Sequence, residues 1–456
     1  MSAVDAVPAS TTWRGELTQL VRLATPIILA RLGIQVMGLT DAVVVGRYSA
    51  RELGYHALGW APTIIVLASA VGLLSGIQVM TARRIGEGRP QLAGVVLRRG
   101  VVYALQLGLG STLVIALGAP QLLLALGMEP DLAAGAGRAA RVFSLSLTPY
   151  LPAVALSYHL EALGRTIPGL VAMWAANIVN LGLNLLLVPG VFGIPAMGAV
   201  GAGWATFGAR SFLLAWLGIA VLTHPTTRGY RLFDRPVREP AAEAEQRRIG
   251  YGAGASVFAE VTAFAGMNVV AAWLSATAVA AWAVFLNTSA IIFMIPLGLA
   301  GAAAVRVGRA YGARDAPGVF RAAIVATGVA IALASVVALI IWPGAGLFAS
   351  AYATEPALKA AAGGALALGA VFFVPDAMQV VLANVQRARG DVIVPTVIHV
   401  GGYVFVMLPM GWWLAHRAHM GLTGCVWAVI ITSFLVAGLL CVRLASTTRR
   451  DQAVEG

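Results

Sequence analysis

The sequence has few charged residues: only 11% of its 456 residues are Asp, Glu, Lys or Arg, whereas 59% are hydrophobic. A soluble domain carries about 25% charged residues. The chain therefore lacks the polar side chains that would cover a surface exposed to water. This shortage excludes an ordinary soluble protein and predicts one that lies in a membrane.

Lysine and cysteine are also scarce, because Lys359 is the only lysine and Cys425 and Cys441 are the only cysteines. The net charge of +12 comes from arginines between apolar runs. A nucleic-acid partner is not expected, since no basic stripe with interleaved aromatic residues occurs. The cysteines lie in one apolar run and predict neither a disulfide bond nor a metal site.

Long apolar runs fill the rest of the chain, and a bilayer core is crossed by about 20 apolar residues in a helix. We expect an all-α membrane protein with twelve transmembrane helices, since a backbone in lipid must satisfy its own hydrogen bonds. The expected spans are 19–45, 56–80, 97–118, 138–158, 168–190, 198–222, 250–272, 278–303, 320–342, 364–386, 393–414 and 421–444.

Arginine placement predicts the orientation of the spans, because basic residues favour the cytoplasmic side. A cytoplasmic N-terminus puts 23 basic residues inside and four outside: Arg47, Arg51, Lys359 and Arg417. Both termini are then cytoplasmic. Residues 1–222 form an N-lobe, 223–249 a polar cytoplasmic linker and 250–456 a C-lobe.

The two halves resemble each other at an offset of 226 residues. The matched pairs are Ser49/Ser275, Gly72/Gly298, Arg83/Arg309, Gly86/Gly312, Pro149/Pro375 and Gly164/Gly390. Six spans in each half mean that both halves enter from the same side, so we expect two parallel six-helix repeats. This plan recurs in transporters.

Three acidic residues lie well inside the expected spans: Asp41, Glu260 and Asp376. A charge in the membrane is costly and calls for a functional or structural reason. Glu260 and Asp376 fall near the same depth, where they could share a proton or ligate Na⁺. Alternatively, the acids pair with membrane arginines, which we expect only in the first half: Arg31, Arg138, Arg141 and Arg210.

Polar and aromatic residues accompany these acids at helical spacing, and we expect some of them to line a substrate cavity. In the first half these are Asn180 and Asn184, although asparagines in spans also join helices to one another. In the second half the candidates are Ser256, Phe264, Asn287, Phe372 and Gln379.

Four segments make the chain resemble the multidrug and toxic compound extrusion (MATE) family, in its NorM-like branch. They are ATPIILARLGIQVMGLTDAVVVGRYSA (Ala24–Ala50), FAEVTAFA (Phe258–Ala265), LNTSAIIFMIPLGLAGAAAVRVGRAYG (Leu286–Gly312) and PDAMQVVLANVQRARGD (Pro375–Asp391). The resemblance covers nearly the whole chain. It implies a V-shaped pair of lobes in the bacterial inner membrane that exports organic, often cationic, compounds by antiport with H⁺ or Na⁺.

The resemblance also implies roles for the three acids. Asp41 matches the N-lobe acid implicated in protonation, and Glu260 and Asp376 match C-lobe acids implicated in cation binding. Two departures stand out. Phe372 replaces a tyrosine of some sodium-coupled relatives, and Trp282-Ala283 replaces a His-Gln pair of many NorM-like proteins.

These two departures bear on which ion drives transport. Phe372, Trp282 and Ala283 offer no side-chain oxygen to Na⁺, whereas two buried carboxylates suffice for a proton. We therefore favour H⁺ and keep Na⁺ at Glu260 and Asp376 as the alternative. No cofactor is expected, and we expect a monomer whose partners are small organic substrates and the bilayer.

Three other functions compete with transport. A membrane enzyme would need a catalytic pair or a motif such as His-Glu-x-x-His, and none occurs. A passive channel would need a filter repeat or pore-lining rings, which are also absent. A flippase for lipid-linked sugars or other lipids, from the same superfamily, is the nearest alternative. Flippases of this kind tend to have more spans and strongly basic cavities.

Overall fold

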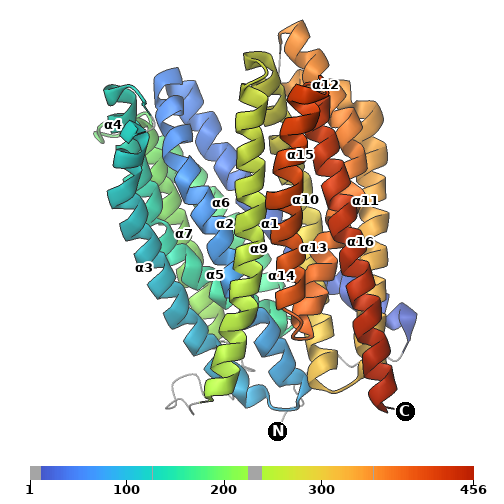
Figure 1. Cartoon of the computed structure of the whole chain (residues 1–456). Coiled ribbons are helices and arrows are strands. Elements are labelled where there is room, and N and C mark those ends of the chain that lie inside the picture. Colours follow the sequence, from blue (N-terminus) through green and yellow to red (C-terminus); the bar gives the residue numbers. More distant parts are fainter. Residues whose placement is uncertain (1–11, 126, 224–238, 353, 456) are drawn as a thin grey trace. The chain divides into compact units, whose positions relative to one another are not determined.

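A computed structural model describes residues 12–125, 127–223, 239–352 and 354–455, and these are helical throughout apart from short connections. Within these residues, twelve helical segments are long and apolar enough to cross a membrane, which confirms the all-α prediction. Figure 1 draws them as coiled ribbons. The uninterrupted spans are α1 (Trp13–Tyr48), α2 (Ala50–Gly86), α6 (Ile167–Leu187), α7 (Gly198–Thr223), α9 (Pro240–Ala272), α10 (Ala276–Gly312), α11 (Ala316–Tyr352) and α16 (Leu422–Glu455). The third span is α3 (Ala93–Ala125), which follows a 3₁₀ turn, Pro90–Leu92.

The fourth and tenth spans are each interrupted near the middle. α4 (Pro130–Leu145) is followed by α5 (Leu147–Ala162), and α12 (Pro356–Gly369) by a 3₁₀ turn (Ala370–Phe372) and α13 (Phe373–Ala388). Proline accounts for both breaks, since it cannot donate a hydrogen bond to the carbonyl four residues earlier. Pro149 and Pro375 therefore leave the Leu145 and Val371 carbonyls without that bond, where the helices are interrupted.

The eleventh span has a different irregularity. It begins as α14 (Ile393–Val400), continues through the π-helical stretch Gly401–Met407 and α15 (Leu408–Trp412), and ends in a second π-helical stretch, Trp413–Arg417. A π-helical turn widens the helix and often occurs at functional sites. Tyr403, a completely buried residue, lies in the first of these stretches.

The helices divide into two compact units. Unit 1 contains Leu29–Gly250, and unit 2 contains Tyr251–Gly456 together with the described residues of Pro8–Ile28. Both boundaries therefore fall inside long helices, α1 and α9. Most of the expected linker, residues 224–238, lies outside the described residues, and α9 begins at Pro240, ten residues before the expected start at 250.

The first turns of α1 are attached to unit 2 by a buried ion pair. Arg306 of α10 donates from Nε to Glu16 Oε1 at 2.8 Å and from its terminal nitrogen to Oε2 at 2.6 Å. Trp13 packs edge to face on Phe320 with ring centroids 6.5 Å apart. The two parallel hydrogen bonds from Arg306 fix both the position and the orientation of the Glu16 carboxylate.

The first turns of α9 are attached to unit 1 in a comparable way. Their glutamates pair with arginines of α2 and α3, at 3.4 Å for Glu245–Arg83 and 3.1 Å for Glu243–Arg99. Gly76 allows the close approach, because a Cβ at that position would lie 2.1 Å from the Gln246 carbonyl oxygen. The first helix of each half therefore starts in one unit and continues in the other.

Candidate functional site

The two acids of the second half belong to one cluster in unit 2, where Asp376 is buried and Glu260 is half-buried. Gln379 of α13 donates to Asp376 Oδ1 at 3.0 Å, and its amide also donates to the Tyr403 hydroxyl. Asp376, Tyr403 and Gln379 all act electrostatically on Glu260 of α9. The structure therefore brings Glu260 and Asp376 together. Tyr403 joins them from the eleventh span, a contact that the sequence analysis missed.

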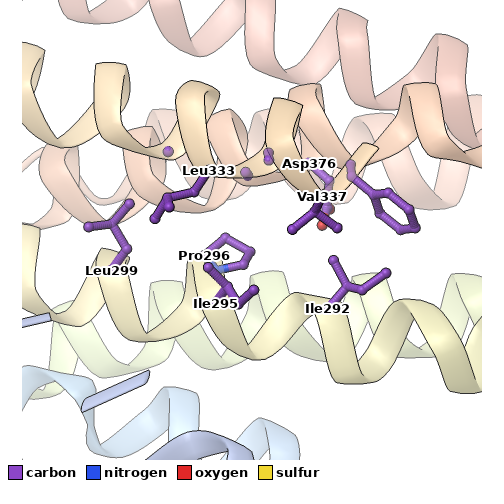
Figure 2. Close-up of a pocket in the computed structure, with 11 residues that line it drawn as sticks. Ile292, Ile295, Pro296, Leu299, Leu333, Val337 and Asp376 are labelled. Atoms are coloured by element: carbon purple, nitrogen blue, oxygen red, sulfur yellow. The ribbon is translucent and has the colours of Figure 1, made fainter. Parts of the chain in front are cut away.

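Asp376 also borders a small apolar cavity of about 10 Å³ (Figure 2). α10 and α11 contribute aliphatic side chains to it, among them Ile292, Pro296, Leu333 and Val337. A cavity of this size has room for about one water-sized sphere. The carboxylate thus has a polar partner, Gln379, within its own helix and apolar neighbours on the cavity side.

Arg387 corrects an expectation, because no arginine was expected within the spans of the second half. It lies near the end of α13, is 4% exposed and donates to Ser256 Oγ at 2.6 Å. Ser256 is one turn before Glu260 on α9, and the guanidinium acts electrostatically on Glu260. Its place at a span end made it look like one of the cytoplasmic arginines.

The remaining candidates of unit 2 differ in their surroundings. Phe264 and Phe372 are in ring contact, with centroids 6.3 Å apart, and Phe264 also contacts the Tyr403 ring at 6.0 Å. They form an aromatic wall beside the carboxylates. Asn287 of α10 is exposed instead, and none of the contacts described above joins it to this cluster.

Asp41 is the centre of a separate buried cluster in unit 1. Asn180 and Asn184 of α6 donate to its Oδ1 at 2.9 and 2.6 Å, and Thr206 of α7 donates to Oδ2 at 2.6 Å. Both asparagines are completely buried and join α6 to α1 through the carboxylate, which is the alternative to a place in the substrate cavity. Thr206 was missed, because it is separated from Asp41 by 165 residues.

Arg210 supplies the positive charge near Asp41. This agrees with the alternative in which the intramembrane acids pair with membrane arginines. Its guanidinium acts electrostatically on Asp41 and donates to Ser146 Oγ at 2.8 Å. It also lies over the rings of Tyr150 and Trp60, with its Cζ 4.4 and 5.4 Å from their centroids. Such cation–π contacts stabilise a guanidinium away from water.

Glu161 is a fourth intramembrane acid that the sequence analysis missed. It is 4% exposed on α5 and pairs with Arg31 of α1 at 3.2 Å. Gln78 donates to its Oε2 at 2.6 Å and Ser157 to its Oε1 at 3.0 Å. The expected fourth span ended at residue 158, so Glu161 fell outside it.

The chain matches the MatE family twice, over residues 26–186 and 253–413. It belongs to the MatE family. The two matches begin 227 residues apart (253 − 26), close to the offset of 226 in the sequence. The duplication into two parallel six-helix repeats, and the resemblance to MATE proteins, are therefore confirmed.

Individual MatE relatives cover almost the full length of the chain. It is 54% identical to a probable multidrug resistance protein NorM of Caulobacter vibrioides, over 96% of this chain and 93% of that protein. It is 32% identical to the multidrug resistance protein PmpM of Pseudomonas aeruginosa, over 96% and 93%. A crystal structure of MATE in the bent conformation matches with a TM-score of 0.88 at 20% identity, over 99% of both chains.

Proposed function

We propose that this protein is a proton-coupled antiporter that exports small organic, cationic or amphipathic compounds across the bacterial inner membrane. The observation that carries the proposal is the pair of carboxylates, Glu260 and Asp376, inside a membrane-spanning unit. Intramembrane acids commonly form proton relays or ion sites. The multidrug resistance names of the MatE relatives support organic compounds as the exported class.

The choice of H⁺ over Na⁺ rests on the groups around Asp376. Sodium would require several oxygen ligands, since hard cations prefer carboxylate, carbonyl and hydroxyl oxygens. Tyr403 and Gln379 supply two oxygens that the sequence argument did not count, which makes Na⁺ a stronger alternative than expected. Phe372 and the aliphatic cavity beside Asp376 still favour a proton, which needs no further ligands.

An open groove in unit 1 supports a drug-sized substrate. It has a volume of about 580 Å³ and lies between α1 and α6, where aliphatic side chains such as Val36, Leu39 and Leu181 line it. Ligand pockets commonly have volumes of about 300–1,000 Å³. Thr40, Arg47 and Tyr48 add polar groups to this wall, which suits an amphipathic rather than a purely apolar compound.

Reconstitution of the purified protein in liposomes tests the proposal. A fluorescent organic cation is loaded, and its efflux is followed under an imposed pH gradient, an imposed sodium gradient, or neither. We expect efflux under the pH gradient alone, and a large loss of this efflux in the Asp376→Asn variant. Efflux under the sodium gradient alone would show that Na⁺, not H⁺, is the coupling ion. Movement of a labelled lipid without efflux of the cation would favour the flippase.

The proposed orientation has both termini in the cytoplasm, supported by the arginine count. Cysteine labelling in whole cells tests it, after Cys425 and Cys441 are replaced by serine. We expect a cysteine at position 240 to react only with a reagent that crosses the inner membrane. Labelling by an impermeant reagent from the periplasm would contradict this orientation.

A further inference from the structure

We propose that Arg387 and Glu260 neutralise each other in unit 2, so that Asp376 alone carries one exchangeable monovalent cation in each transport cycle. This inference rests on the proposed antiport. It assigns Arg387 the role of a fixed counter-charge. It also gives different roles to Glu260 and Asp376, which the sequence alone does not distinguish.

The position of Arg387 supports the first part. Its side chain is buried, bonds to Ser256 one turn from Glu260, and acts electrostatically on the Glu260 carboxylate. A buried guanidinium without a nearby negative charge is strongly unfavourable. Arg387 is the one basic side chain of the described residues that acts on Glu260, so the guanidinium offsets the charge of that carboxylate.

The other buried acids of the described residues support the second part, because each has an arginine of its own. Glu161 pairs with Arg31, Glu16 pairs with Arg306, and Asp41 lies in the field of Arg210. In the cluster around Glu260, two carboxylates face one arginine, Arg387. Within the described residues, Asp376 is thus the buried acid whose charge no basic side chain balances.

The other groups around Glu260 and Asp376 do not change this count of charges. Glu260 is faced by Asp376, Arg387, Gln379 and Tyr403. His399 of α14 lies near Arg387 and contacts the Tyr403 ring edge to face, with ring centroids 6.1 Å apart. His399 is buried, and a positive charge on it would lie beside the guanidinium. We therefore count His399 and Tyr403 as neutral. The cluster of Glu260, Asp376 and Arg387 has one net negative charge, which one cation neutralises.

The first experiment measures the coupling ratio of the unmodified protein. Liposomes at zero membrane potential hold a monovalent organic cation that does not cross the bilayer by itself, tetraethylammonium, and its distribution is followed at equilibrium under several pH gradients. One proton per substrate gives a gradient that changes about tenfold per pH unit, whereas two protons give about a hundredfold. A tenfold slope supports the proposal and a hundredfold slope overturns it. Absence of any gradient-driven movement would instead refute the proposed function.

The second experiment uses charge rescue. Glu260→Gln leaves Arg387 to neutralise Asp376, so coupling should fall at least about tenfold. Glu260→Gln with Arg387→Gln restores one net negative charge on Asp376 and should recover most of the lost coupling. Glu260→Gln with Arg389→Gln is the matched control, since Arg389 is the C-cap residue of the same helix, and it should recover none.

Two readouts keep the rescue interpretable if a variant folds poorly. Gel filtration and binding of tetraethylammonium identify variants that are intact, and only these are compared. Full coupling in Glu260→Gln alone, or no recovery in an intact Glu260→Gln/Arg387→Gln protein, would each overturn the proposal. Recovery that the Arg389 control matches would do the same, because it would show an effect of overall charge.

Discussion

The two units place opposite charges at equivalent positions. With the offset of 226, Glu161 of unit 1 corresponds to Arg387 of unit 2 (161 + 226 = 387). In unit 1 the acid pairs with Arg31 of the first helix, and in unit 2 the arginine bonds to Ser256 of α9. The same helix end thus joins the first helix of its repeat in both units, with the sign of the charge exchanged.

A second pair of equivalent positions differs in chemistry as well. Tyr150 follows Pro149 in unit 1, and Asp376 follows Pro375 in unit 2. Tyr150 contributes its ring to the guanidinium of Arg210, whereas Asp376 contributes a carboxylate beside an apolar cavity. The duplicated helix break therefore presents a neutral group in one unit and an acid in the other. Duplication preserved the backbone irregularity while the chemistry at it diverged.

The largest expected effect comes from removing the acid that has no counter-charge. Asp376→Asn should lower proton-driven efflux by about hundredfold or more, the scale on which loss of a proton-transferring side chain acts. The comparison variant is Asp41→Asn, for which we expect about a tenfold loss, since each hydrogen bond to a charged group is worth about 1.5 kcal/mol or more. Efflux rates in liposomes under a fixed pH gradient measure both.

Equal losses in these two variants would break the contrast between the units. They would show that Asp41 also carries a coupling ion, which is the role that the resemblance to MATE proteins implies for it. A larger loss for Asp41→Asn would move the ion site to unit 1 altogether.

The stability of the protein should depend on the buried ion pair of unit 1, in which Glu161 contacts Arg31 directly. Glu161→Ala removes the partner of Arg31 and leaves the buried guanidinium without its counter-charge. We therefore expect the free energy of unfolding to fall by about 3–5 kcal/mol. Arg31→Leu combined with Glu161→Leu should recover most of that loss, because an apolar pair avoids burying charge. Thermal unfolding in detergent, followed by gel filtration, ranks the variants by stability. A double variant less stable than Glu161→Ala would contradict this account.

Sequence reasoning located the spans and the acids of unit 2, because hydropathy and intramembrane charge are local signals. Glu260 and Asp376 were expected at one depth, and the structure joins them. Tyr403 and Thr206 were missed, since their bonds to Gln379 and Asp41 depend on how helices distant in sequence pack. Arg387 was misassigned for another reason: near a span end, hydropathy alone does not separate a buried charge from a solvated one.

A moderate effect is expected at Gln379, which connects Asp376 to Tyr403. Gln379→Ala removes the amide that donates to the carboxylate and should lower efflux by about tenfold, because a hydrogen bond to a charged group is worth about 1.5–3 kcal/mol. Gln379→Glu is the informative companion, since it adds a third acid to the cluster. If Gln379 only fills space, Gln379→Met would match the unmodified protein in rate and in pH profile.

The smallest effect is expected at Asn287, which the sequence placed in the same cavity as Gln379. Its side chain is exposed on α10, whereas Gln379 is completely buried beside Asp376. An exposed substitution away from caps and networks usually changes stability by less than about 0.5 kcal/mol. Asn287→Ala should therefore leave proton-driven efflux within about twofold of the unmodified protein, because 0.5 kcal/mol corresponds to about that factor. A loss comparable to that of Gln379→Ala for one substrate, with another substrate unaffected, would place Asn287 on the substrate path instead. The ratio of rates for two probes of different shape separates these outcomes, since a residue that acts on the coupling ion lowers both rates together.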